Sequence, residues 1–138
     1  MSNKSISILF IATVVVQILS AILFSMFSDG FYSLSDGQLF KCGDLVSSGG
    51  DDEVIMLVFA GLVFPALFRI FRMKRKASGA EAFIFIGIMG ASIWIALQSS
   101  DCGEFATTMI GNRDPFLLVF FVSGLLSVLT MVKLAVRP

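Results

Sequence analysis

The two cysteines of the chain, Cys42 and Cys102, are the residues whose chemistry the sequence predicts most directly. Each begins a similar run, Cys-Gly-Asp from position 42 and Cys-Gly-Glu from position 102. With the apolar stretches described below laid across a membrane, both cysteines fall on the outer face, which is oxidising in a bacterial periplasm or a secretory lumen. We therefore expect one intramolecular disulfide between them. A redox-active pair is the alternative, but that chemistry usually needs a close Cys-x-x-Cys motif and a quinone site or second pair.

The residue types in the chain give little indication of a metal site or of hydrolytic catalysis. The chain has no histidine, which removes imidazole bases, Ser-His triads and the commonest metal ligand. The outer acidic residues supply oxygens of the kind that calcium takes, but they lack the spacing of an EF-hand loop. We interpret them as solvated charges that help to set the topology, and we predict no cofactor, no metal site and no enzymatic activity. These residues are Asp51, Asp52, Glu53, Asp101 and Glu104.

Four apolar stretches dominate the chain, at residues 6–27, 54–71, 82–97 and 115–131. A membrane-spanning helix needs about 20 apolar residues, and the short second stretch gains length if Arg69 and Arg72 extend their charged ends to the interface. Of 138 residues, 57% are hydrophobic and 14% charged, against about 25% charged in soluble domains. We therefore predict an all-α integral membrane protein, a four-transmembrane-helix antiparallel bundle. It forms a single membrane domain over residues 1–138, with outer loops at 28–53 and 98–114 and a cytoplasmic loop at 73–80.

Basic and acidic residues sort to opposite sides of these four spans. With the N-terminus inside, eight basic residues and Glu81 lie inside, while nine acidic and two basic residues lie outside. An excess of Lys and Arg in short loops fixes the orientation of a membrane protein. We therefore expect both termini to be cytoplasmic, in a bacterial inner membrane. The inside basic residues are Lys4, Arg69, Arg72, Lys74, Arg75, Lys76, Lys133 and Arg137.

The first outer loop carries a turn signal. Asp36 and Gly37 stand between two runs that contain aromatic residues, and an Asp-Gly pair in that setting favours a β-hairpin. We therefore predict a small β-hairpin within residues 28–53.

Weakly polar side chains recur at helical spacing within the first and fourth spans. Such groups hydrogen-bond across helices in lipid, and small residues let helices approach closely. We interpret the two stripes as the interior of the bundle, with Gln17 bonded to a neighbour such as Ser123 or Ser127. A polar pore lining is the alternative. The stripes are Thr13, Gln17 and Ser20, and Ser123, Ser127 and Thr130. Close helix packing is expected at Gly61, Gly87, Gly90 and Ala91, and a helix kink at Pro65.

The layout of four spans, inside termini, a large first outer loop and an outer disulfide broadly resembles claudin-type proteins. Those carry a Trp, Gly-Leu-Trp and two-cysteine signature in one loop, whereas this first outer loop has no Trp and one Cys. Small multidrug transporters share the length and the number of spans, but they need a glutamate in the first span, where this chain has Gln17. The sequence therefore supports no family assignment.

Three functional hypotheses follow. The leading one is a non-enzymatic structural or accessory subunit that assembles with itself or with other membrane proteins, in contact with membrane lipid and without nucleic acid. The second is a channel or carrier for a neutral or weakly polar solute, lined by the two polar stripes. The third is an immunity or exclusion protein that acts against a pore-forming toxin.

Overall fold

The computed structural model describes residues 2–27, 31–32, 39–44, 52–111 and 113–136. Helices dominate this part of the chain, and two strands of two residues each accompany them. Residues 42–44 are also helical. The elements are α1 (Asn3–Phe27), β1 (Phe31–Tyr32), β2 (Leu39–Phe40), α3 (Asp52–Phe71), α4 (Gly79–Ser99), α5 (Asp101–Gly111) and α6 (Pro115–Val136).

Helices α1, α3, α4 and α6 are each long and apolar enough to cross a membrane. They have 25, 20, 21 and 22 residues. At 1.5 Å per residue they measure about 30–38 Å, enough for a hydrocarbon core of about 30 Å. Each contains one predicted apolar stretch in full and runs a few residues further. In α6 the added residues are 132–136, which are mostly apolar.

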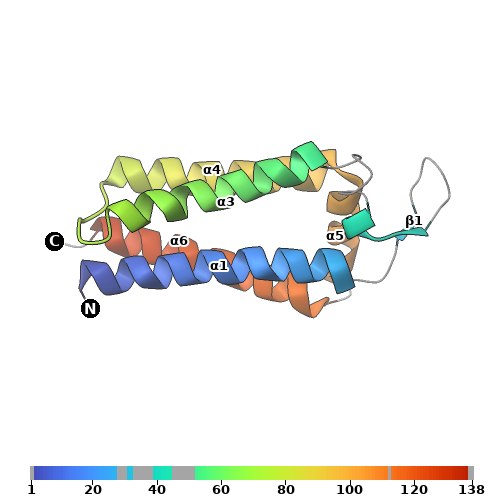
Figure 1. Cartoon of the computed structure of the whole chain (residues 1–138), viewed down its shortest axis with the longest axis horizontal. Helices are drawn as coiled ribbons and strands as arrows, with labels where there is room; N and C mark the ends of the chain where they lie inside the picture. Colours follow the sequence, from blue (N-terminus) through green and yellow to red (C-terminus); the bar gives the residue numbers. More distant parts are fainter. Residues whose placement is uncertain (1, 28–30, 33–38, 45–51, 112, 137–138) are drawn as a thin grey trace.

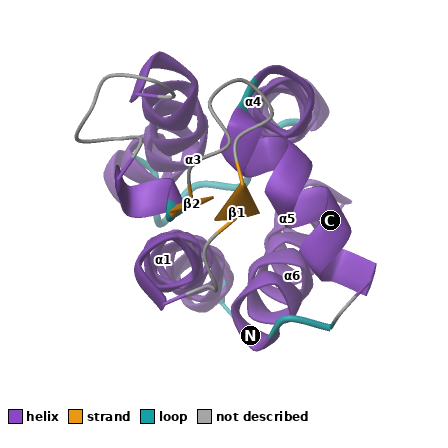
Figure 2. Cartoon of the chain, turned by 90° about the vertical axis from the view of Figure 1, so that its right-hand side faces the viewer, coloured by secondary structure: helices purple, strands orange, loops and turns teal. Residues whose placement is uncertain are grey.

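The four long helices pack as antiparallel neighbours in a ring. Helix α1 packs against α6 and α3, and α4 packs against α3 and α6, with the most extensive contact between α1 and α6 (Figures 1 and 2). Helix α1 begins and α6 ends beside the α3–α4 turn. We call this the basic end, after its exposed residues Lys4, Lys74, Arg75, Lys76 and Lys133, and we call the opposite end, which holds Cys42 and Cys102, the disulfide end.

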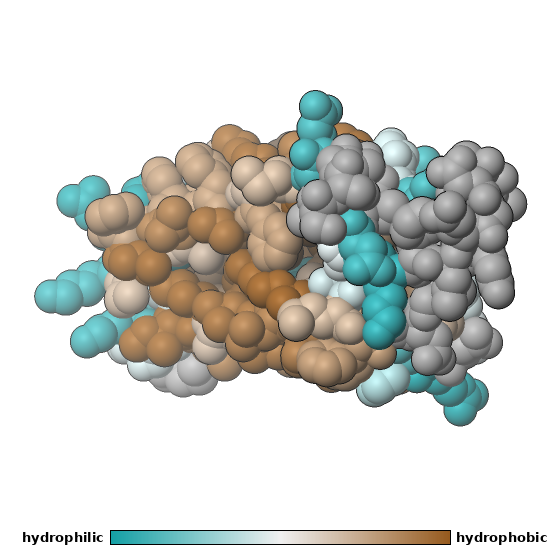
Figure 3. Space-filling view, turned by 45° about the vertical axis from the view of Figure 1, so that its right-hand side comes forward, coloured by the Kyte–Doolittle hydropathy of each residue, from teal (hydrophilic) through white to brown (hydrophobic). Residues whose placement is uncertain are grey.

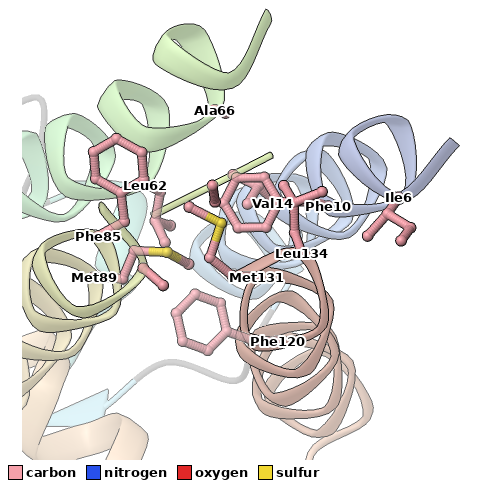
Figure 4. Close-up of a cluster of buried hydrophobic side chains, with 12 residues drawn as sticks. Ile6, Phe10, Val14, Leu62, Ala66, Phe85, Met89, Phe120, Met131 and Leu134 are labelled. Atoms are coloured by element: carbon pink, nitrogen blue, oxygen red, sulfur yellow. The ribbon is translucent and has the colours of Figure 1, made fainter. Parts of the chain in front are cut away.

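Apolar side chains fill the centre of the bundle. Phe10, Leu62, Phe85, Phe120 and Met131 come from all four long helices and meet in one buried cluster (Figure 4). The exterior between the two ends is also apolar, with hydrophilic residues gathered toward the ends (Figure 3). A chain that is apolar inside and along its flanks is suited to a lipid solvent rather than to water.

Local capping explains where the helices begin. The Ser78 hydroxyl accepts a hydrogen bond from the Glu81 amide at 3.0 Å, which starts α4 and matches the Ser-x-x-Glu capping pattern. The Asp114 carboxylate accepts from the amides of Phe116 and Leu117 at 2.9 and 3.0 Å. It thereby starts α6, with Pro115 at the first helical position, where proline is well tolerated.

Most of the connection predicted at residues 98–114 is helical and forms α5. The Ser100 hydroxyl accepts a hydrogen bond from the Gly103 amide at 2.9 Å and so caps this helix. Its C-terminal end is closed by bonds from Arg113 N to Ile110 O and from Asp114 N to Met109 O, with Arg113 at φ 59°. These two bonds form a Schellman-type turn. Helix α5 lies across the disulfide end of the bundle (Figure 1).

The two short strands pair antiparallel, with Phe31 opposite Phe40 and Tyr32 opposite Leu39. The predicted turn at Asp36 and Gly37 lies outside the described residues, as do residues 33–38 as a whole. Two residues per strand do not make an independent sheet, so the described architecture is helical and the β-hairpin stays a prediction.

Candidate functional site

The basic end contains a buried ionic cluster centred on Arg69. Its Nη1 donates to the Glu81 carboxylate at 2.8 Å, and the two side chains are 0% and 5% exposed. Its Nη2 donates to the Ser7 hydroxyl and to the carbonyls of Arg72 and Arg75. One guanidinium therefore ties together α1, the end of α3, the α3–α4 turn and the start of α4.

A second arginine reaches the same carboxylate from the edge of this cluster. Arg72 donates to Glu81 Oε2 at 3.1 Å, and its guanidinium lies 5.5 Å from the centre of the Phe68 ring. Arg69 lies in the last turn of α3, Arg72 directly follows that helix, and Glu81 lies in the first turn of α4, which is favourable for the two helix dipoles. We infer that the ionic cluster stabilises the packing of α1, α3 and α4 at the basic end.

Arg69 therefore corrects the expectation that it extends to the membrane interface. It points into the bundle, where the carboxylate and turn carbonyls replace water as its hydrogen-bond partners. The sequence did hold a signal. Glu81 is the one acidic residue among the basic residues predicted on that side, and a lone acid there needs a partner if it is buried.

The two polar stripes lie inside the bundle, where all six of their residues are buried. Each hydroxyl donates to the carbonyl three residues earlier in its own helix, at 2.7–3.0 Å. Bonds of this kind satisfy a hydroxyl without a partner helix. They also leave no hydroxyl proton directed toward a central path. The residues are Thr13, Gln17, Ser20, Ser123, Ser127 and Thr130.

Gln17 differs from the hydroxyl residues of its stripe. Its carbonyl oxygen Oε1 is buried and has no hydrogen-bond partner within the described part of the chain. The hydroxyls of Ser123 and Ser127 donate within α6, so neither donates to this oxygen. The amide instead packs on α6 at Gly124, where an added Cβ would lie 2.8 Å from Nε2. Gln17 therefore marks a close α1–α6 contact at Gly124.

The glycines predicted at close helix packing divide into two groups. A Cβ on Gly61 would lie 2.7 Å from Cβ of Ser92, so Gly61 does hold α3 against α4. Gly87 and Gly90 have nothing within 4 Å of an added Cβ, and both lie with Ala91 on the exposed face of α4. The expectation of close packing within the bundle is wrong for these three residues. Helical spacing predicts a shared face but does not say whether that face turns inward.

Pro65 lies on the buried face of α3, one turn after Gly61, and the helix continues through it from Asp52 to Phe71. The kink itself stays a prediction.

The contact at Gly61 leads to a testable expectation. Gly61→Ala should lower the free energy of unfolding by about 1–3 kcal/mol, because the new methyl overpacks the α3–α4 contact. Gly87→Ala is the matched control, and it should be neutral or stabilising by up to ~1 kcal/mol, because alanine favours helix and meets no neighbour. Thermal unfolding in mild detergent measures both. Adding Ser92→Gly should recover part of the Gly61→Ala loss, and equal effects of the two alanine substitutions would contradict the assigned contact.

The disulfide end holds the predicted bond between Cys42 and Cys102, which are 60 residues apart with a Cα–Cα distance of 5.4 Å. The glycine after each cysteine explains the similar Cys-Gly runs. A Cβ on Gly43 would lie 3.2 Å from Ser25 O of α1, and one on Gly103 would lie 2.7 Å from Leu97 Cα of α4. Each glycine therefore lets its segment sit directly on the end of a long helix, which brings the two sulfurs together.

A cavity of about 390 Å³ lies directly beneath the disulfide. It is lined by residues of α1, α3, α4, α5 and α6, and both cysteines form part of its wall. Its size falls in the range of small-molecule sites. Sequence reasoning missed it, because no pattern in the chain indicates where helices diverge.

No group of three or more Cys, Asp or Glu side chains among the described residues is placed to hold a metal ion. Asp51 lies outside the described residues. Asp101 and Glu104 both belong to the exposed side of the first turn of α5, where acidic residues suit the helix dipole.

Comparison of the chain with protein-family models, with curated proteins and with solved structures found no match.

Proposed function

We propose that the protein is a non-enzymatic subunit of a membrane assembly, which joins a second copy or another membrane protein through the exposed face of α4. The observation that carries the proposal is a group of small, exposed residues on that face, Gly87, Gly90 and Ala91. Two large aromatic side chains bound it, Phe83 at 81% exposed and Trp94 at 66% exposed. We call these five residues the α4 face.

The two glycines of the α4 face have no role within the bundle, since neither would touch a neighbour if it carried a Cβ. Glycine costs about 1 kcal/mol relative to alanine in a helix, and a lipid-facing position does not need it. In membranes, small residues separated by three or four positions allow a second helix to approach closely. A partner helix seated between Phe83 and Trp94 accounts for both the glycines and the exposed aromatic rings.

A channel lined by the polar stripes has weaker support. The hydroxyls of the stripes donate to carbonyls of their own helices. The centre of the bundle is filled by Phe10, Leu62, Phe120 and Met131, so a solute would have to displace apolar side chains. No observation among the described residues favours the immunity hypothesis over the subunit hypothesis.

We place the basic end in the cytoplasm, because the exposed residues Lys74, Arg75 and Lys76 lie in the α3–α4 turn and positive loops stay inside. In a bacterial inner membrane, the disulfide end would then face the oxidising periplasm. Ser78→Cys should react with a membrane-impermeant thiol reagent only after the cells are opened. Glu53→Cys, exposed near the disulfide end, should react in intact cells. Labelling of Ser78→Cys in intact cells would contradict the proposed orientation.

The subunit proposal is tested on the α4 face with Gly90→Leu. Gly90 is exposed, and a Cβ added to it has no neighbour within 4 Å, so folding should be retained while the approach of a partner helix is blocked. We expect the dissociated fraction to rise at least tenfold in mild detergent, measured as the mass of the assembly. Ala12→Leu, on the exposed side of α1, is the matched control and should leave the assembly unchanged.

A further inference from the structure

We propose that the cavity beneath the disulfide binds one acyl chain of a membrane phospholipid. The cavity has a volume of about 390 Å³. That volume would hold about thirteen water molecules at roughly 30 Å³ each, and a methylene group is of similar size. The space therefore fits a single hydrocarbon chain of ordinary length.

The lining of the cavity is suited to hydrocarbon rather than to water. It is almost wholly apolar, and the hydroxyls that border it are already bonded within the protein. Ser25 donates to Ile22 O and Ser100 to Ala96 O, both at 2.8 Å. Apolar cavities of this kind stay dry and take up apolar ligands. A quinone ring or another polar head would find no free hydrogen-bond donor among the described side chains of the wall.

The position of the cavity gives lipid a route to it. The α1 residues that line it are Ala21, Ile22, Phe24 and Ser25, which places it in the last two turns of that helix, next to the disulfide end. The cavity is open rather than sealed, and its wall includes Ile22 of α1 and Phe121 of α6, which are each 37% exposed on the apolar exterior. Acyl chains are the most concentrated apolar groups at that surface, so mass action favours them as the occupant.

The disulfide completes the wall of this acyl-chain site. Cys42 and Cys102 both line the cavity, and their bond holds residues 42–44 and α5 against its end. None of the five residues of the α4 face lines this cavity. The acyl-chain site is therefore separate from the proposed assembly and does not depend on it.

Substitution of Ala21 tests the proposal. Ala21 lines the cavity, and Ala21→Phe should fill much of it, whereas Ala12→Phe places the same ring on the exposed side of the same helix. Native mass spectrometry of protein extracted from membranes should find one retained phospholipid on the wild type and on Ala12→Phe. The fraction that carries lipid should fall at least tenfold in Ala21→Phe. Equal retention by all three proteins would overturn the proposal, as would an isoprenoid lipid or no lipid on the wild type.

A second measurement uses the wild-type chain and so does not depend on whether Ala21→Phe folds. The protein is placed in phosphatidylethanolamine vesicles that contain a phosphatidylcholine with a photoreactive diazirine at the end of one acyl chain. Illumination should label cavity residues such as Leu62, Ile93 and Ala106. Labelling confined to lipid-facing residues such as Val15 and Leu125, both exposed and outside the cavity wall, would contradict the acyl-chain site.

Discussion

Replacing Glu81 with alanine should lower the free energy of unfolding by about 3–5 kcal/mol, because the change leaves the Arg69 guanidinium buried without its counter-charge. Arg69 is fully buried, and its other hydrogen bonds go to the neutral Ser7 hydroxyl and to the carbonyls of Arg72 and Arg75, which do not balance its charge. Thermal or denaturant unfolding in mild detergent measures the loss. Glu53→Ala removes an exposed carboxylate from the first turn of α3 and should cost less than ~1 kcal/mol.

The double substitution Arg69→Met with Glu81→Leu separates the charge from the packing. Removing both partners of a buried ion pair is often far milder than removing one. We therefore expect the double variant to recover more than half of the loss in Glu81→Ala. If Glu81→Ala lowers the free energy of unfolding no more than Glu53→Ala does, the ionic cluster does not stabilise the basic end.

Replacing both Cys42 and Cys102 with serine should have the second large effect. The disulfide closes a loop with a sequence separation of 60. The chain-entropy relation assigns such a loop about 4 kcal/mol, which is an upper value because inserted helices already restrict the unfolded chain. The double variant should therefore melt at a lower temperature while it still inserts in the membrane.

The matched control for the disulfide is the wild-type chain treated with a reductant. Reduced wild type and the double serine variant should melt at the same temperature, since both lack only the bond. Freshly purified protein should release no thiol that can be alkylated before reduction. Two reactive thiols in unreduced protein, or equal melting temperatures with and without the bond, would contradict a stabilising disulfide.

The four long helices and the disulfide could be predicted from the sequence because both rest on strong physical constraints. A stretch of about 20 apolar residues has few stable alternatives to a membrane helix. Two cysteines on one oxidising side have few alternatives to pairing.

The features that sequence reasoning missed depend on which neighbour a side chain meets. Arg69 was expected at the interface, but three turn and helix segments supply enough acceptors to hold it inside. Gly61 and Gly87 have the same residue type, yet one meets Ser92 and the other meets nothing. Periodicity places residues on a common face, whereas the direction of that face is decided by how all four helices pack. The cavity beneath the disulfide follows from the same packing.

The most direct test of the subunit proposal is the protein mass of wild-type particles extracted, with surrounding lipid, from native membranes by a membrane-solubilising polymer. We predict a protein mass above the 15.0 kDa of one chain. A multiple of that mass would indicate self-assembly, and an added larger chain would identify a partner. A protein mass of 15.0 kDa at every concentration, together with solute flux in vesicles of the purified protein, would contradict the subunit proposal in favour of the channel.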